Sequence, residues 1–515
     1  MLERWFGVKI HHHLHILGMM VLAFGLPMNK VLMSIGAIWG ASNLILEGKF
    51  SDYWKNIQQN RTVQFLLGFF LLHVVAMAWS SNWEYGLHDL RIKLPLLAVP
   101  LALVAHPISK KTEIHTILIT FLISLLICTG YNFNYFLHFI SQNSPEKFRE
   151  MSQFGSHIRF GILVAIGSFI SLYFAWHYRK WIIPFILVAI WLLIYTFYSQ
   201  VVSGLISIIA GVVFGGIYYL WQRKWLRLTI ISSGFLLFIL AILLLQSLNN
   251  PKDLSGIKVE HWTAKGHYYY NDLENPLFEN GKPIYLHISP EELIEDWPKY
   301  FKIPYKGKDK KGRAIQETFY RYMTAKDLKK DAEGLSKLSS SDIQNIENGL
   351  VSPELLEKGI FSRFNAIRYQ LENSSNPNGQ SLLQRIEYWK TAIHIIQENP
   401  ILGVGTGDVQ DAFNAQYTKH KTQLLPEYWF RAHNMFLTVQ LSFGILGSLL
   451  FLSFLYSFLK INFQARQLIA FCIFGAIFAS FFMEDTLETQ TGVSLFAFFL
   501  GLFLVPNDAL SKTKS

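Results

Sequence analysis

Long apolar segments separated by short polar connections recur along most of this 515-residue chain. Most of them approach or exceed the roughly 18–20 residues that an α-helix needs to cross the hydrocarbon core of a bilayer, about 30 Å thick. The alternating segments of about ten residues that build a membrane β-barrel are absent from the sequence. The pattern therefore predicts an all-α polytopic membrane protein with about twelve transmembrane helices, near residues 14–29, 31–46, 62–79, 94–106, 113–131, 157–176, 181–199, 203–220, 226–247, 433–459, 467–483 and 491–506.

Composition and charge placement support this prediction. The chain is 51% hydrophobic and only 16% charged, whereas about a quarter of the residues in a soluble domain are charged. Its net charge of +10 is not read as a nucleic-acid signal, because the basic residues gather in alternate short connections, as expected for cytoplasmic loops. These residues are Lys49, Lys55, Arg61, Lys110, Lys111, Arg179, Lys180, Arg223, Lys224, Arg227, Lys460, Arg466, Lys512 and Lys514.

This charge bias predicts that both termini lie in the cytoplasm and that one long loop lies outside. We therefore divide the chain into helices 1–9 (1–248), a large outer loop (249–432), and helices 10–12 with a short cytoplasmic tail (433–515). Within the loop, 250–371 is polar, contains many aromatic residues and is expected to fold as an insertion of mixed α/β character. Its alternating run 283–288 predicts a strand, and 339–358 predicts a helix. The second part, 380–432, is expected to form the rim of an active site.

Arg385 is the first candidate in this rim. At 100° per residue, Leu382, Ile386, Trp389, Ile393 and Ile396 form one apolar stripe, and Arg385 lies at its edge. An arginine in that position either lines a pocket or covers apolar surface with its aliphatic stem. The spacing alone leaves both interpretations open.

His433 is the second candidate, since it stands where the outer loop becomes an apolar helix. The positive end of the helix dipole disfavours an imidazolium ion, and a neutral ring is what a general base needs. The alternative is a histidine that only anchors the helix at the membrane interface.

Several further basic residues are predicted on the outer side, where the charge bias does not explain them: Arg91, Lys93, Arg159 and Arg431. An ionisable residue inside a span is costly and is therefore a functional hypothesis by default. Guanidinium groups suit phosphate because they offer planar pairs of donors. Each residue alone could contact a lipid headgroup, but together they favour a diphosphate ligand.

Metal and nucleotide sites are not expected. The glycine-rich turn 403–408 lacks the residue order of a nucleotide-binding P-loop, and the end of the preceding helix explains its glycines. The acidic group Glu484, Asp485 and Glu488 is not expected to bind a divalent cation. We predict no cofactor and no bound metal, and we interpret Cys128 and Cys472 as thiols buried among apolar residues.

Three short motifs occur in order: Arg385 with Tyr388-Trp389, Asn399-Pro400-Ile401-Leu402-Gly403-Val404-Gly405, and His433-Asn434 followed by Phe436-Leu437. With the twelve spans and the long outer loop, they resemble the O-antigen ligase superfamily, which includes O-antigen polymerases and protein O-oligosaccharyltransferases. The insertion 250–371 is longer than is usual in that family, so the resemblance says nothing of its role.

The resemblance implies a GT-C-like glycosyltransferase acting at the periplasmic face of a Gram-negative inner membrane. Its donor would be a glycan on undecaprenyl diphosphate, its acceptor a sugar hydroxyl of the lipid A–core, and its reaction inverting and independent of metal. His433 would be the base and Arg385 an essential arginine. Arg159 and Arg91, with Lys93 and Arg431, would bind the diphosphate, and the supporting residues would be Tyr388, Trp389, Asn434 and His157.

Two classes of alternative stay open. A polymerase or a protein O-oligosaccharyltransferase would use the same donor with another acceptor. A transporter of lipid-linked glycans also fits twelve spans, but it would place charged or helix-breaking residues deep within several of them, whereas the notable residues here lie near the outer ends.

Overall fold

The computed structural model describes residues 10–140, 151–199, 201–222, 258–274, 277–279, 281–310, 312–353, 377–378 and 380–505. The chain forms two compact units, one of Met1–Ile230 with Arg385–Ser515 and one of Ile231–Gln384. We call them the helical unit and the insertion unit. Within the described residues, seven helices are long and apolar enough to cross a membrane, or eight if a pair bent by 119° is one span. The predicted all-α polytopic membrane fold is confirmed.

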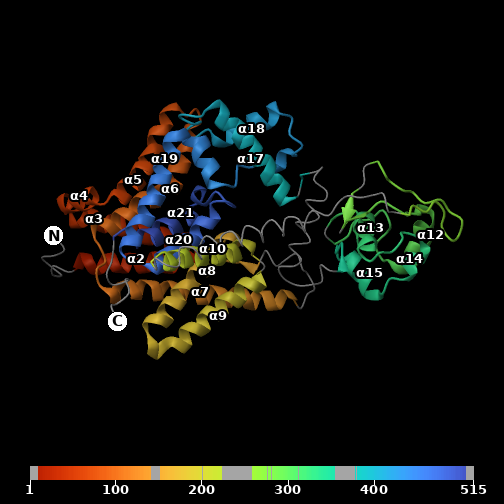
Figure 1. Cartoon of the computed structure of the whole chain (residues 1–515), viewed down its shortest axis with the longest axis horizontal. Coiled ribbons are helices and arrows are strands. Elements are labelled where there is room, and N and C mark those ends of the chain that lie inside the picture. The colour runs from red at the N-terminus through yellow and green to blue at the C-terminus, as the bar shows by residue number, and fades with distance from the viewer. Residues whose placement is uncertain are drawn as a thin grey trace. The chain divides into compact units, whose positions relative to one another are not determined.

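Most helices of the helical unit coincide with predicted apolar segments, and Figure 1 labels them all. They are α2 (Ile10–Met28), α3 (Lys30–Glu47), α4 (Phe50–Gln59), α5 (Arg61–Val75), α6 (Trp83–Ala105), α7 (Lys111–Ile140), α8 (His157–His177), α9 (Ile182–Ser199), α10 (Val202–Trp221), α17 (Ser381–Glu398), α18 (Val409–Lys419), α19 (Met435–Gln464), α20 (Leu468–Ser480) and α21 (Gln490–Gly501). The segment expected at 226–247 lies outside the described residues, and α20 and α21 are shorter than a full span. The number twelve therefore stays a prediction.

Helix α6 differs from its prediction because it begins at Trp83 rather than near residue 94. Charged side chains in its first half concealed it from a search for apolar runs. Two of them neutralise each other, since Lys93 Nζ lies 2.5 Å from Asp89 Oδ2 one helical turn away. A buried ion pair of this kind lets a helix carry charge where a single charge would be too costly.

The ends of several helices meet on the side that carries the basic connections. The Asn60 side chain, after α4, donates to the Leu504 carbonyl, after α21 (2.7 Å). His12 at the start of α2 contacts Glu113 at the start of α7 (2.9 Å). Because helices α6, α19 and α21 run between this side and the other, Trp83, Met435 and Gln490 lie at their opposite ends. The functional candidates lie at those opposite ends.

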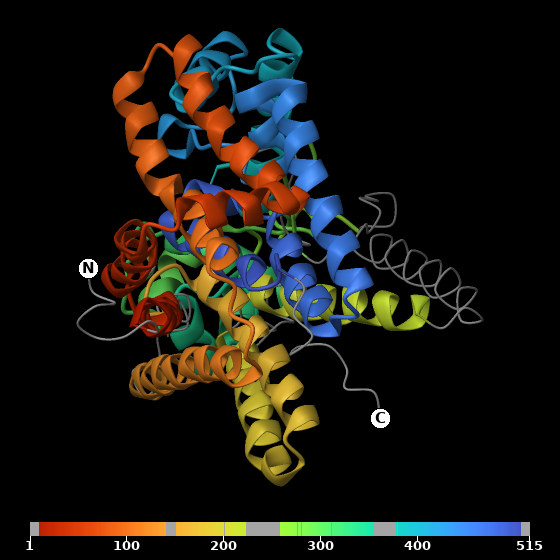
Figure 2. The same cartoon turned by 90° about the vertical axis from the view of Figure 1, so that its left-hand side faces the viewer.

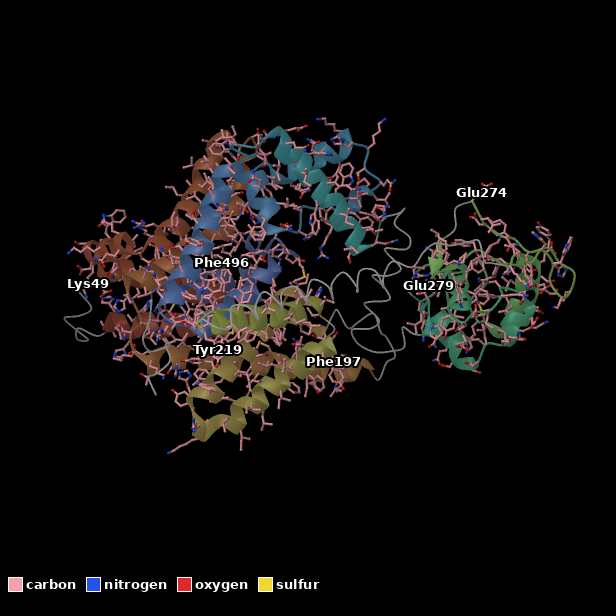
Figure 3. All side chains as sticks on the ribbon, viewed as in Figure 1. Lys49, Phe197, Tyr219, Glu274, Glu279 and Phe496 are labelled. Atoms are coloured by element: carbon pink, nitrogen blue, oxygen red, sulfur yellow. The ribbon has the colours of Figure 1, made fainter. Side chains whose placement is uncertain are left out.

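Phenylalanine side chains fill the interior of the helical unit. Phe454 of α19 lies 5.5 Å from Phe496 of α21, measured between ring centroids, and Phe496 is labelled in Figure 3. Helix α19 packs along α5, and Figure 2 shows the two, in blue and orange, running side by side. Close packing of such rings makes this interior dense.

The insertion unit has a small core of its own. Its described residues form a two-stranded antiparallel sheet, β1 (Phe278–Glu279) and β2 (Lys282–Pro283), and four short helices: α12 (Pro290–Tyr300), α13 (Ile315–Ala325), α14 (Ala332–Ser336) and α15 (Ser340–Glu347). Trp297 is buried at the centre, stacked 4.0 Å from Phe301. Glu279, labelled in Figure 3, pairs with Arg321 of α13 (2.7 Å).

The strand predicted at 283–288 is wrong for most of its length, because residues 284–287 form a turn. His287 has a positive φ of 54°, which interrupts an extended backbone. Of the helix predicted at 339–358, α15 covers 340–347, and residues 354–358 lie outside the described residues.

Candidate active site

The connection between α20 and α21, residues 481–489, carries three buried or nearly buried carboxylates: Glu484, Asp485 and Glu488. Its 3₁₀ turn η7 spans Thr486–Glu488. A buried carboxylate is stable only with cations or hydrogen-bond donors around it. The partners of these three residues define the site.

Glu484 lies between three cationic or basic side chains from separate parts of the chain. Its Oε1 atom is 3.6 Å from Arg385 Nη2 of α17. Its Oε2 atom is 3.9 Å from Arg159 Nη2 of α8 and 3.6 Å from His433 Nδ1, just before α19. The structure therefore brings together Arg385, Arg159 and His433 around one carboxylate.

These neighbours determine the ionisation of Glu484. Burial raises the pKa of a carboxyl group, but the His433 imidazole and the guanidinium groups of Arg159 and Arg385 outweigh burial, so the pKa of Glu484 lies below its ordinary value. Glu484 is therefore an anion at neutral pH and a fixed electrostatic partner for the cations.

The same cluster contains polar atoms with unused hydrogen-bonding capacity. Among the described residues, Arg159 Nε, Arg385 Nε and the Tyr388 hydroxyl are buried without a hydrogen-bond partner, while His433 Nδ1 faces the Glu484 carboxylate at 3.6 Å. Unpaired buried donors are costly and are uncommon in folded proteins. Donors gathered in this way suit an anionic ligand that accepts several hydrogen bonds.

The backbone at His433 is held in an unusual conformation. Its φ is +47°, a left-handed region that costs a residue with a side chain roughly 1–2 kcal/mol. Asp485 compensates by accepting the backbone N–H groups of His433 (3.0 Å) and Asn434 (2.9 Å) and the Thr438 hydroxyl (2.7 Å). The connection between α20 and α21 thus fixes both the position of His433 and the cation cluster.

Asn434 is the N-cap of α19, and its side-chain oxygen accepts the N–H groups of Phe436 (3.1 Å) and Leu437 (3.2 Å). This cap satisfies donors that would otherwise be unpaired at the helix start. The structure therefore gives Asn434 a positioning role next to His433.

Helix α17 supports the other side of the imidazole. Trp389 donates from Nε1 to the Ala432 carbonyl (2.9 Å), and the Tyr388 ring lies 5.7 Å from the His433 ring. Burial raises the pKa of Tyr388 to about 12, so its hydroxyl stays protonated at neutral pH and can donate a hydrogen bond to a ligand.

The stripe predicted for α17 has the wrong phase. Ile386 and Ile393 are exposed, at 36% and 46% of their surface, whereas Tyr388, Ala392 and Ile395 are buried. The three buried residues pack with Val409, Phe413 and Tyr417 of α18. The sequence of α17 contains two apolar faces, and only tertiary packing selects between them.

A second ionic cluster lies beside the first and shares the 481–489 connection. Glu488 Oε2 is 2.8 Å from Arg431 Nη1, and Glu488 Oε1 is 2.9 Å from Lys93 Nζ. Arg431 also donates to the Tyr85 hydroxyl. Burial opposes ionisation of Glu488, but Lys93 and Arg431 outweigh it and lower its pKa to about 2.

The remaining candidates occupy other positions. Arg91 is exposed on α6, two residues from Lys93 and therefore about 200° away around the helix. It does not join either cluster. His157 is the first residue of α8, two positions before Arg159.

The glycine-rich turn after α17 docks into a break in α19. Gly444 has φ 60° and ψ −154° within α19, and the carbonyls of Leu441 and Ser442 accept the N–H groups of Val404 and Gly405 (both 2.9 Å). Farther on, the Asp408 carboxylate accepts the N–H groups of Ser81 and Asn82 (both 2.7 Å at the shortest) before α6. The motif 399–405 thus holds α17 and α18 against the membrane helices.

Sequence reasoning missed Glu484 and Asp485 as site residues. Their signal was visible, because they form a compact acidic group on the side where the arginines were expected. Within the described residues, no three His, Cys, Asp or Glu side chains are arranged to hold a metal ion.

Comparison with known proteins adds one match. Nothing among curated proteins matches the chain. The family model described as O-antigen ligase matches residues 343–452, a range that contains Arg385, the 399–405 motif and His433. Members of this family are glycosyltransferase-like enzymes, ligases or polymerases, with glycan substrates. The match confirms the predicted resemblance to the O-antigen ligase superfamily over residues 343–452 of this multi-pass membrane protein.

Proposed function

We propose that this protein is an O-antigen ligase-type glycosyltransferase. In this proposal it moves a glycan from undecaprenyl diphosphate to a sugar hydroxyl of the lipid A–core at the periplasmic face of the inner membrane. The observation that carries the proposal is the arrangement of Arg159, Arg385 and His433 around Glu484. Such a group combines an anion-binding site with a base.

The arginines would bind the leaving diphosphate. Arg159 and Arg385 each retain an Nε donor without a partner in the described part of the chain, and guanidinium groups bind phosphate through paired donors. They would stabilise the negative charge that develops as the glycosidic C–O bond breaks, which is the electrostatic contribution that dominates many enzymes.

His433 would act as the general base. With Glu484 3.6 Å from Nδ1, the proton of a neutral imidazole is favoured on Nδ1, leaving the Nε2 lone pair for the acceptor. Nε2 would take the proton of the acceptor hydroxyl as its oxygen attacks the anomeric carbon. The diphosphate leaves from the opposite face, so the anomeric configuration inverts.

Arg431 and Lys93 would contribute from the second cluster. Because both are paired with Glu488, we propose that they fix the 481–489 connection and add positive potential. Direct contact with the diphosphate would fall to Arg159 and Arg385. Exposed Arg91 would contact lipid headgroups or the donor outside this cluster.

His433→Asn tests the catalytic assignment. Asparagine tolerates a positive φ better than most residues, so the backbone is preserved while the base is lost. We expect transfer from purified undecaprenyl-diphosphate-linked glycan to lipid A–core to fall by about 10²- to 10⁴-fold, the usual contribution of a general base. His394→Asn, in α17 beside His420, is the matched control, and unchanged transfer by His433→Asn would remove the assignment.

The acceptor needs a separate experiment, since a polymerase or a protein O-oligosaccharyltransferase would use the same donor site. Cells lacking a ligase accumulate polymer on undecaprenyl diphosphate and make lipid A–core without it. Cells lacking a polymerase carry a single repeat unit on the core. Loss of glycan from a protein acceptor, with lipopolysaccharide intact, indicates the third activity.

A further inference from the structure

A row of aromatic side chains faces outward from residues 260–270 of the insertion unit. Trp262, Tyr268 and Tyr270 are exposed at 63%, 60% and 54% of their surface. Large aromatic residues concentrated in one exposed place commonly mark a binding surface. The catalytic proposal above uses none of them.

The row arises from a short antiparallel hairpin. Trp262 pairs opposite Tyr268, and the Thr263 and Tyr269 N–H groups donate to the carbonyls of His267 (2.8 Å) and His261 (2.9 Å). Successive residues of extended backbone point to opposite faces. Thr263 and Tyr269 are therefore buried beneath the hairpin, and the other three rings are on its outer face.

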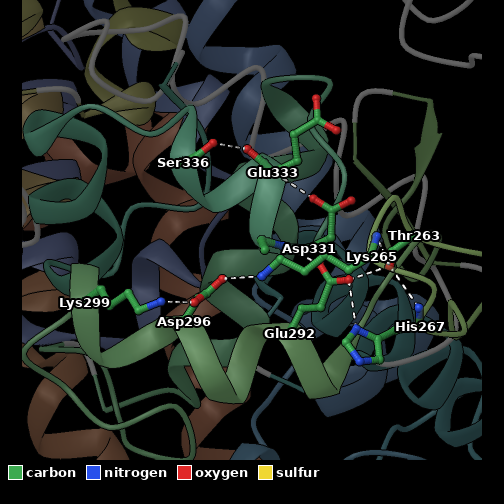
Figure 4. A network of polar contacts seen from close by, with 11 residues as sticks. Thr263, Lys265, His267, Glu292, Asp296, Lys299, Asp331, Glu333 and Ser336 are labelled. Atoms are coloured by element: carbon green, nitrogen blue, oxygen red, sulfur yellow. Dashed lines mark hydrogen bonds and ion pairs between the residues drawn. The ribbon is translucent and has the colours of Figure 1, made fainter.

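A polar network holds the underside of the hairpin rigidly (Figure 4). Glu292 of α12 accepts the Thr263 hydroxyl and contacts His267 Nδ1 (3.0 Å). It also accepts the Ala332 N–H (3.0 Å), while the Tyr269 hydroxyl donates to Asp331. Side chains on such a support lose little freedom on binding, which favours affinity.

The rings form a corner rather than a flat patch. Trp262 and Tyr268 lie 5.3 Å apart at 82°, and His261 is nearly parallel to Tyr268 (19°, 6.2 Å). A ligand placed on the Trp262 face would meet Tyr268 at its edge. This shape suits a small ring with an apolar face and a polar rim.

The charges around the row argue against anionic lipid surfaces and nucleic acids as partners. Residues 258–274 contain two lysines and three carboxylates, and Glu260 pairs with Lys329 (2.6 Å). Anionic lipid surfaces and single-stranded nucleic acids are bound by clusters of basic residues. The tip of the hairpin, Ala264-Lys265-Gly266, is exposed and polar, so it is also unsuited to entering a bilayer.

We propose that this hairpin is a carbohydrate-binding platform, with Trp262 stacking on the apolar C–H face of a pyranose. Tyr268 and the Glu260–Lys329 pair would bind hydroxyl groups at the rim of the sugar. The ligand class rests on the proposed function, because the glycan handled by the enzyme is the ligand that the platform would bind. The insertion unit then carries a second glycan site, formed by residues other than those of the catalytic cluster.

The test uses the full-length protein in lipid nanodiscs and a fluorescently labelled glycan released from the lipid-linked donor by mild acid. We expect Trp262→Ala and Tyr268→Ala each to weaken binding by about 3- to 10-fold, as measured by fluorescence anisotropy. Trp262→Phe keeps a ring and should retain most of the affinity. Trp54→Ala, at a 60% exposed tryptophan of α4, is the control and should bind as the wild type does.

Three outcomes separate this proposal from its alternatives. Wild-type affinity in the Trp262→Ala/Tyr268→Ala double variant would overturn it. Quenching by brominated lipid of a fluorophore at position 262 would place the row in the bilayer and also overturn it. His433→Asn should lose transfer yet bind the lipid-free glycan normally, so failure of the catalytic proposal and failure of the platform are distinguishable.

Discussion

Glu484 is an anion within a site that we propose binds an anionic diphosphate. Its role is explained by the two arginines beside it. Without substrate, two arginines this close repel each other and need a counterion. Glu484 supplies it and keeps both guanidinium groups beside His433. A diphosphate brings more charge and more acceptor atoms than one carboxylate, so it can engage the unused Nε donors without displacing Glu484.

Glu484→Gln tests this division of roles. The amide removes negative charge, so the donor should bind at least as tightly and its KM should not rise. The imidazolium that forms when His433 accepts a proton loses its counterion, so kcat should fall by about 10- to 100-fold. Steady-state kinetics with varied donor measure both constants. An increase in KM with unchanged kcat would instead show that Glu484 only shapes the binding site.

Glu488 makes the stability of the fold depend on pH. Its pKa is lowered from 4.5 to about 2, so its stabilising effect is fully present above pH 4.5 and is lost as the pH falls towards 2. Glu488→Gln leaves Arg431 without its carboxylate partner and leaves Lys93 with Asp89 alone, and a nearly buried charge that loses its partner is strongly destabilising. The unfolding temperature of the variant should therefore lie below that of the wild type at neutral pH.

The difference in unfolding temperature between the wild type and Glu488→Gln should become smaller between pH 4.5 and 2, because protonation of Glu488 removes the same interaction from the wild type. Tryptophan fluorescence during heating in detergent measures it. Glu427→Gln, at an exposed carboxylate, should shift stability by less than about 0.5 kcal/mol. A difference that stays constant over the acid range would show that the charge of Glu488 is not what stabilises the fold.

At the residue scale, the sequence could identify basic candidates but not their partners. Arg385, Arg159 and His433 were predicted because each breaks a local rule of charge or position. The sequence shows Glu484 as part of an acidic group on the outer side, but the cations that it pairs with are identified only when segments more than 300 residues apart, such as those of Arg159 and Glu484, come together. For Lys93, the sequence could not show that two carboxylates enclose its ammonium group.

At the scale of elements, the all-α polytopic fold could be predicted because a membrane helix is determined largely by its own apolar composition. The start of α6 and the phase of α17 were missed because both depend on neighbours. Asp89 and Glu488 neutralise Lys93 in α6, and α18 selects which face of α17 is buried. The glycine-rich turn is a further example, since its partner is a break in α19 about 40 residues later.

The docking of this turn predicts a specific sensitivity at Gly403. It has φ +69°, and an added Cβ would lie 2.3 Å from the Ser442 carbonyl carbon. Gly403→Ala should destabilise the protein by about 1–3 kcal/mol and lower transfer, because α17 would shift from His433. Thermal unfolding and transfer assays measure the two effects.

Gly216→Ala in α10 is the matched control, since a Cβ there meets nothing within 4 Å. It should be neutral or stabilising by up to about 1 kcal/mol, the helix preference for alanine over glycine. Equal losses in the two variants would show that the docked turn has no special importance.

At the scale of the whole molecule, the charge bias of the sequence predicts which connections lie on each side of the membrane. In the folded chain, contacts between helix ends distinguish two ends of the helical unit. The basic connections lie with the ends of α4, α6 and α21. The carboxylate connection and His433 lie where α20 ends and α19 begins. We therefore predict that the catalytic cluster faces the periplasm and the basic connections face the cytoplasm.

Cysteine labelling tests this orientation, since both native cysteines lie within predicted spans and Cys128 is buried. Glu427→Cys, exposed in the loop before His433, should react with a membrane-impermeant maleimide in cells whose outer membrane alone is permeabilised. Gln58→Cys, exposed in α4, should react only after the inner membrane is opened. The reverse pattern would place the cluster in the cytoplasm, where a lipid-linked donor already translocated to the outer leaflet could not reach it.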